Sequence, residues 1–173
     1  MKDLDAVIEY TEAAMKATPE GHISRAKRLN NLGYSLCRRY ERTGNLQGLM
    51  GAVSYAEAAV KATSDDHITA VVWWNNLGSF LCSRFERTGN LQDLETAINY
   101  SEKVLKATPE DHAKWATWSD SLGTRLHSRY QRTGNPQDLE AAIKHVEAAV
   151  NGTPQNYEDC ATWLANLGTV LFT

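Results

Sequence analysis

The sequence lacks three features that mark large classes of protein. It has no apolar run long enough to span a bilayer, so it predicts no membrane-embedded helix. Its net charge is −3 and it has no block of like charges, which argues against nucleic acid as a partner, because that binding depends on Lys and Arg contacts to phosphate. Its three cysteines are odd in number and lack metal or redox spacing. The first five residues do not resemble a signal peptide, so we expect a cytoplasmic protein with reduced thiols.

Motifs for catalysis are also missing. The sequence holds no His-Glu-x-x-His, P-loop or nucleophile-elbow pattern, so it predicts no enzyme, no metal and no cofactor. Two Asp-His pairs, Asp66-His67 and Asp111-His112, are candidates for a metal or catalytic role. Adjacent residues on a helix do not face one another, so helix capping and packing are the favoured interpretation of both pairs.

What the sequence does contain is a repeat. The stretch from Asn75 to Asn90 recurs three times nearly whole and a fourth time cut short. Its Leu-Gly pair returns every 45 residues, with the glycines at Gly33, Gly78, Gly123 and Gly168. We therefore expect a single array over residues 1–173: a half unit 1–19, units 20–64, 65–109 and 110–154, and a half unit 155–173.

Each unit predicts two helices. Thr18-Pro19-Glu20 has the residue types of a helix start, so the first helix of the unit (helix A) should begin near residue 20 and end before Gly44. The second helix (helix B) follows an Asn, most clearly at Asn135-Pro136, and a preceding helix B should span residues 4–17. No strand pattern is present, so the predicted fold is all-α with eight helices, helix A of about 20–24 residues and helix B of about 15.

The apolar side chains predict which faces are buried. The helix A stripe is Leu29, Leu32, Leu36 and Tyr40, and the return of Gly33 in each unit indicates close approach of a neighbouring helix. The helix B stripe is Leu94, Ala97, Ile98, Ser101, Val104 and Leu105. Trp73, Trp118 and Trp163 occupy one repeated position, which favours core packing between repeats over a ligand platform.

These residues resemble the tetratricopeptide family. Its Leu-Gly, Ala and Pro positions match Leu77-Gly78, Ala97 and Pro109. The Asp66-His67 pair, followed by Asn75-Asn76-Leu77, is similar to the long-repeat subgroup of kinesin light chain, and the Arg-Thr-Gly-Asn turn looks like arrays in fungal multidomain proteins. The resemblance implies a right-handed solenoid of helical hairpins that binds a protein or peptide, with helix A lining a concave groove.

A helical wheel predicts which helix A residues face that groove. Opposite the leucine stripe lie residues with mostly small hydroxyl or amide side chains. In the family such asparagines hold a peptide backbone, since an amide both donates and accepts. The alternative is that they are solvated or pair with the next helix. The candidates are Lys27, Asn31, Tyr34, Arg38, Asn76, Ser79, Ser83, Ser121, Thr124 and Asn166.

Two rows of arginine also recur. Arg39, Arg84 and Arg129 form one row, and Arg42, Arg87 and Arg132 form the other. They could bind anions along a stripe, but local contacts with helix ends and with acids such as Glu41 and Glu86 are favoured.

The sequence thus predicts a non-enzymatic scaffold for protein–protein interaction. One alternative is a regulatory segment of a larger fungal multidomain protein, with the groove occupied by a sister domain. Another is a self-assembling array. The helices begin with a helix B and end with a helix A, so the last helix of one molecule could complete a unit with the first helix of another.

Overall fold

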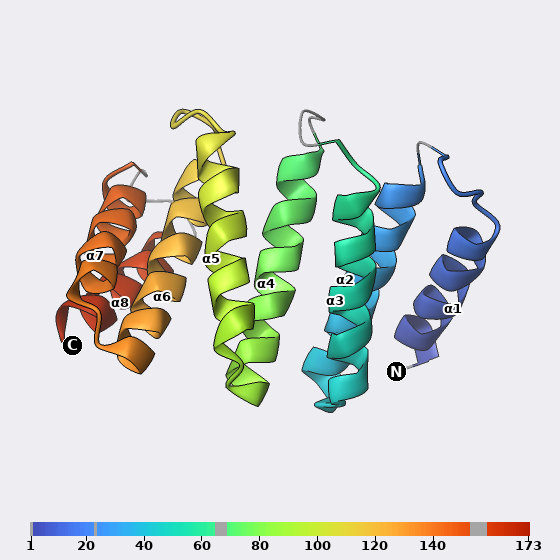
Figure 1. Ribbon diagram of the computed structural model, residues 1–173, viewed down its shortest axis with the longest axis horizontal. Helices are drawn as coiled ribbons and strands as arrows, with labels where there is room; N and C mark the ends of the chain where they lie inside the picture. Colours follow the sequence, from blue (N-terminus) through green and yellow to red (C-terminus); the bar gives the residue numbers. More distant parts are fainter. Residues whose placement is uncertain (1, 23, 65–68, 153–158) are drawn as a thin grey trace. The chain divides into compact units, whose positions relative to one another are not determined.

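The computed structural model describes residues 2–22, 24–64, 69–152 and 159–173. Over these residues the chain is all-α, with eight helices and no strand, as predicted (Figure 1). They belong to two compact units, Met1–Gly89 and Asn90–Thr173. The helices are α1 Lys2–Lys16, α2 Arg25–Thr43, α3 Leu46–Lys61, α4 Ala70–Thr88, α5 Leu91–Lys106, α6 Trp115–Thr133, α7 Pro136–Asn151 and α8 Cys160–Leu171.

The first unit is built around the hairpin of α2 and α3. Helix α1 packs on α2, and α4 packs on both α3 and α2. Tyr40 at the end of the predicted helix A stripe is half-buried, and the leucine part of the stripe is buried, with Leu32 fully enclosed. It meets a small-residue face of α3 that is also fully enclosed, so the two helices can approach closely. That face is Leu49, Ala52, Val53, Ala56 and Ala59.

The second unit repeats this plan with the hairpin of α6 and α7. Helix α5 packs on α6, and α8 packs on α7 and α6. The predicted helix B stripe is confirmed in α5, with Leu105 half-buried and the other five residues buried. The repeated tryptophans Trp73, Trp118 and Trp163 are buried, in agreement with a core role.

The turn between helix A and helix B has the predicted chemistry. Gly44, Gly89 and Gly134 end their helices in the left-handed region, with φ of 67°, 71° and 70°. An L side chain is disfavoured there, which explains glycine at this position. The asparagine that follows each glycine caps helix B, and its side-chain oxygen accepts from the backbone N–H two residues on. These caps are Asn45 to Gln47 at 3.0 Å, and Asn90 to Gln92 and Asn135 to Gln137, both at 3.1 Å.

The predicted start of helix A near residue 20 is wrong. Helix α2 begins at Arg25, and Thr18 belongs to the end of α1, where its hydroxyl donates to the Ala14 carbonyl at 2.7 Å. The chain then turns, with the His22 N–H donating to the Pro19 carbonyl. A side-chain hydroxyl that donates to the carbonyl four residues earlier satisfies one of the free carbonyls at a helix C-terminus. Threonine is common at helix starts, but Thr18 closes the end of a helix here.

As predicted, glycine in helix A lets a neighbouring helix approach closely at Gly33 and Gly123, but not at Gly168. A Cβ on Gly33 would lie 3.0 Å from the Ala52 carbonyl oxygen, and one on Gly123 would lie 3.0 Å from that of Ala142. At Gly168 in α8 a Cβ would meet nothing within 4 Å.

Candidate functional site

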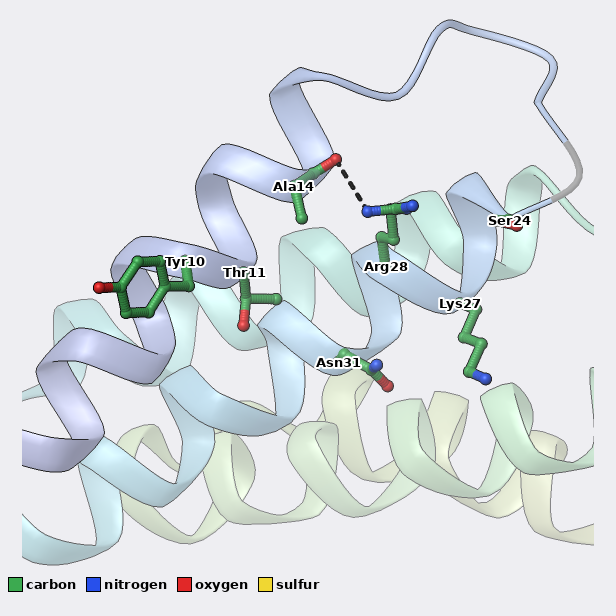
Figure 2. Close-up of a pocket in the computed structure, with 7 residues that line it drawn as sticks. All are labelled: Tyr10, Thr11, Ala14, Ser24, Lys27, Arg28 and Asn31. Carbon is green, nitrogen blue, oxygen red and sulfur yellow. Dashed lines mark hydrogen bonds between the residues drawn. The ribbon is translucent and has the colours of Figure 1, made fainter.

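A polar pocket of the first unit lies where α1 meets α2. A pocket of about 410 Å³ is lined by Tyr10, Thr11 and Ala14 from α1, and by Ser24, Lys27, Arg28 and Asn31 from α2 (Figure 2). Lys27 and Asn31 are exposed, and both belong to the predicted groove face. Two of the predicted groove residues therefore line a pocket, which the sequence-based groove prediction did not include.

Arg28 reaches from α2 toward the end of α1. Its Nη1 donates to the Ala14 carbonyl at 3.3 Å (Figure 2). Its Nε is buried and has no hydrogen-bond partner among the described residues. An arginine has five N–H donors and always carries its charge, so this guanidinium is poorly satisfied by the protein alone.

The remaining predicted residues of α2 continue this surface along the helix. Tyr34 and Arg38 are exposed, with 53% of Tyr34 accessible. Arg38 forms an ion pair with Glu41 at 2.7 Å. Lys27, Asn31 and Tyr34 make no side-chain hydrogen bond with any residue that the structure describes, so their polar groups are open to a ligand.

The asparagines of the later repeats are differently occupied. The Asn76 side-chain amide donates to Asn30 Oδ1 at 3.0 Å, and that of Asn166 donates to both carboxylate oxygens of Asp120 at 3.0 Å. Each bond links a helix A to the preceding helix A. These two asparagines therefore use their side-chain N–H donors to pair with a neighbouring helix, which is the alternative to a peptide contact.

The hydroxyl candidates bond within their own helices. Ser79 donates to the Asn75 carbonyl at 3.0 Å, and Ser121 donates to that of Thr117 at 2.9 Å. Thr124 donates to the Ser121 carbonyl at 3.1 Å. Ser79, Ser83, Ser121 and Thr124 are half-buried, so they offer a ligand less surface than α2 does.

The second unit contains a buried carboxylate in its helix A interface. Asp120 is almost fully enclosed, and burial raises its pKa above the usual range. The hydrogen bond from Asn166 acts in the opposite direction, and the negative charge of Asp159 raises the pKa further. Among the described residues this site has one amide partner and no cation, which suits a structural link better than acid–base chemistry.

Arg129, in the first arginine row, makes a local contact with the following helix. Arg129 holds Asp138 with two hydrogen bonds, Nε to Oδ2 at 2.8 Å and Nη2 to Oδ1 at 2.6 Å. The hydrogen bond with Asp138 is the main reason that the pKa of Arg129 is raised. Arg39 stands at the equivalent place in the first unit, but the position of the acid is taken there by Gly48.

The Asp-His pairs are partly described. Asp66-His67 lies outside the described residues. His112 accepts from the Lys114 N–H at 3.1 Å and its ring stacks on Trp118, with centroids 5.3 Å apart. Asp111 is exposed and α6 begins only at Trp115, so the histidine, not the aspartate, caps this turn. In the described part of the chain no three metal-ligating side chains come together.

Sequence reasoning missed Tyr10, Thr11 and Arg28. A signal for Arg28 was present, because the 45-residue period places it in register with Trp73, Trp118 and Trp163. This position is held by buried tryptophan in the three later repeats, so a charged residue there distinguishes the surface of the repeat that contains α2.

Comparison with known proteins agrees with this architecture. Residues 75–113 match the tetratricopeptide repeat family. The chain carries a tetratricopeptide repeat. No curated protein matches it, and no helix among the described residues is both long and apolar enough to cross a membrane.

Solved structures extend the likeness of fold to nearly the whole chain. BtubC (BKLC) from P. vanneervenii superposes with a TM-score of 0.73 at 18% identity, over 98% of this chain and 66% of BtubC. A kinesin-light-chain-like protein from Podosopora anserina, with nearly identical TPR-like repeats, gives a TM-score of 0.70 at 14% identity, over 98% of this chain and 78% of that one. The chain thus has the fold of a tetratricopeptide-like helical repeat array, and it spans just under two thirds of BtubC.

Proposed function

We propose that this chain is a non-enzymatic, intracellular scaffold that binds a segment of a partner protein on the outward face of α2. The tetratricopeptide fold is consistent with protein–protein interaction. The observation that supports α2 in particular is its run of exposed polar side chains, Lys27, Asn31, Tyr34 and Arg38. An exposed aromatic beside amide and cationic groups is typical of protein-binding surfaces.

The contrast within the first unit supports the same choice. Helix α4 carries Asn76, Ser79 and Ser83 at the positions equivalent to Asn31, Tyr34 and Arg38. These residues are half-buried, and the Asn76 amide is already bonded to Asn30. An amide that keeps both its donor and its acceptor for a ligand can pair with an extended peptide unit, as Asn31 can.

Photo-crosslinking tests this proposal. The photoreactive amino acid p-benzoylphenylalanine would replace Tyr34, and a matched control would replace Glu57, which is exposed on α3. We expect a defined partner to crosslink in cells at position 34 and not at 57, and Asn31→Ala to reduce its capture more than Asn76→Ala does. Equal crosslinking at both sites would contradict the proposal. Mass spectrometry of the adduct would also separate a partner protein from a sister domain of a larger protein.

A second candidate function is self-association, supported by two uncovered faces. In α8, Leu164 and Leu171 are 53% and 58% exposed, whereas the equivalent Leu29 and Leu36 in α2 are buried. In α1, Val7 is 48% exposed, although its equivalents Ala52, Ala97 and Ala142 are fully buried. These faces correspond to the two sides of a helix A–helix B contact, so α8 of one copy would pack on α1 of a second.

Sedimentation velocity over a range of concentrations tests this association. We expect reversible growth in mass that Leu171→Glu abolishes and Glu57→Gln does not affect. A strict monomer at high concentration would rule it out.

A further inference from the structure

We infer that the pocket between α1 and α2 binds the carboxylate of an acidic side chain, with Arg28 as its main ligand-binding residue. The inference rests on the proposed function, because the acidic side chain is taken to belong to the partner segment on α2. It adds the chemical identity of one residue in that segment.

The first step is the unmet hydrogen-bonding capacity of Arg28. Its single side-chain hydrogen bond within the described residues is long, at 3.3 Å, and its Nε is shielded from solvent without an acceptor. A partly desolvated cation without a counter-ion is unfavourable, and a carboxylate is the acceptor whose geometry matches the guanidinium fork.

The second step is the charge around the pocket. None of its seven lining residues is acidic, and Lys27 adds a second cation at its edge. Neither Lys27 nor Arg28 forms an ion pair with any residue in the described ranges. The positive charge is therefore not neutralised by α1 or α2 where they line the pocket.

The third step is the hydrogen-bonding character of the remaining wall. Tyr10 contributes a hydroxyl group from α1, where the Thr11 hydroxyl already donates to the Val7 carbonyl at 2.6 Å, while Ser24 and Asn31 contribute a hydroxyl and an amide from α2 (Figure 2). A volume of about 410 Å³ has room for a side chain that enters from the segment lying over Lys27 and Asn31. Because the carboxylate would arrive on a peptide, it is favoured over a free anion.

The repeat itself supplies a matched variant. Trp73, Trp118 and Trp163 are buried at the position equivalent to Arg28. Arg28→Trp should therefore keep the helices while removing the guanidinium, and Arg28→Gln removes the charge with a smaller change of shape. Arg42→Gln is the control, since Arg42 is exposed in the last turn of the same helix and does not line this pocket.

The experiment is a titration of the isotopically labelled chain followed by NMR. The probes are the blocked peptides acetyl-Gly-Glu-Gly-amide and acetyl-Gly-Gln-Gly-amide, and inorganic phosphate, all at constant ionic strength. We expect the glutamate peptide to shift the Arg28 Nε–H signal and the Thr11 and Asn31 amide signals saturably. The glutamine peptide should bind at least tenfold more weakly, and phosphate more weakly than the glutamate peptide.

Both Arg28 variants should lose this response while retaining the circular dichroism and melting of the parent, and Arg42→Gln should retain it. Equal shifts by the two peptides, or an undiminished response in both Arg28 variants, would overturn the inference. Tighter binding of phosphate than of the glutamate peptide would instead make this a free-anion site and refute the peptide carboxylate. Crosslinking at position 34 without any response of Arg28 would separate failure of this inference from failure of the proposed scaffold function.

Discussion

The side-chain amide nitrogen of Asn166 lies 3.0 Å from each carboxylate oxygen of Asp120, which precedes it by one repeat and one residue. Asn76 and Asn30 stand in the same relationship in the first unit, also at 3.0 Å. The asparagine that recurs in helix A thus links neighbouring repeats in both units. In α2 the equivalent Asn31 is exposed, and its side chain has no hydrogen-bond partner among the described residues, which leaves it open to a partner.

The Asn166–Asp120 hydrogen bond should contribute measurably to stability. Asn166→Ala removes the donor of an almost buried carboxylate, so we expect the free energy of unfolding to fall by about 1–2 kcal/mol. Asn31→Ala, at the same repeat position but without a side-chain partner, should change it by less than about 0.5 kcal/mol. Urea denaturation followed by circular dichroism measures both, and equal losses would contradict the link.

The raised pKa of Asp120 predicts a pH dependence of stability. Burial, its main cause, makes the folded protein hold this proton more tightly than the unfolded chain does. The free energy of unfolding should therefore decrease as pH rises from the unfolded pKa, about 3.9, through the higher folded pKa. Asp120→Asn, which copies Asn30 of the first unit, should flatten the curve, and urea melts across that pH range would detect this. An unchanged slope in the variant would assign the dependence to other groups.

Much of the fold could be predicted from the sequence because its signals are local and repeated. The Gly and Asn pairs at residues 44–45, 89–90 and 134–135 fix the turns through backbone conformation and capping, which neighbouring residues alone determine. The start of helix A was mispredicted since a Thr-Pro pair suits either a helix end or a helix start, and the choice depends on tertiary packing.

The candidate site was harder to predict for a similar reason. A helical wheel correctly separates Leu32 from Asn31, but it cannot tell which outward amide will find a partner on the next helix. Asn76 and Asn31 look identical in sequence, and the Asn30 side chain that bonds Asn76 comes from a different helix. Arg28 was missed because the wheel assigns residues to faces of one helix, whereas the pocket lies between two.

The Arg129–Asp138 ion pair should contribute to stability. Asp138 is almost fully buried, so Arg129→Ala leaves an unpaired carboxylate and should cost about 2–4 kcal/mol of unfolding free energy. Arg39→Ala is the matched control, because the equivalent acid is replaced by Gly48 and the cost should be below about 1 kcal/mol. Thermal and urea unfolding would compare the two, and similar losses would show that the pair is not the cause.

Cys37 should react slowly with thiol reagents. Burial, with a smaller contribution from the negative charge of Glu41, raises its pKa to about 11. Since the thiolate is the nucleophile, alkylation by iodoacetamide near pH 8 should be slow at Cys37 in the folded chain and should accelerate on unfolding. Peptide mass spectrometry of timed samples would measure this rate, with Cys82, which is half-buried, as the internal comparison. Faster labelling of Cys37 than of Cys82 would contradict the expectation.

The helix A glycines should respond in opposite directions to the same substitution. In Gly123→Ala the new Cβ would lie 2.5 Å from Val146 Cγ2 and 3.0 Å from the Ala142 carbonyl oxygen, so the backbone of α6 or α7 must shift. We expect a loss of about 1–3 kcal/mol in unfolding free energy, as for other overpacked interiors. In Gly168→Ala the Cβ meets nothing within 4 Å, and the gain in helix propensity should stabilise α8 by about 0.5–1 kcal/mol. Urea denaturation of both variants would show this difference in sign. If Gly123→Ala were neutral or stabilising, close approach could not be the reason for glycine in helix A.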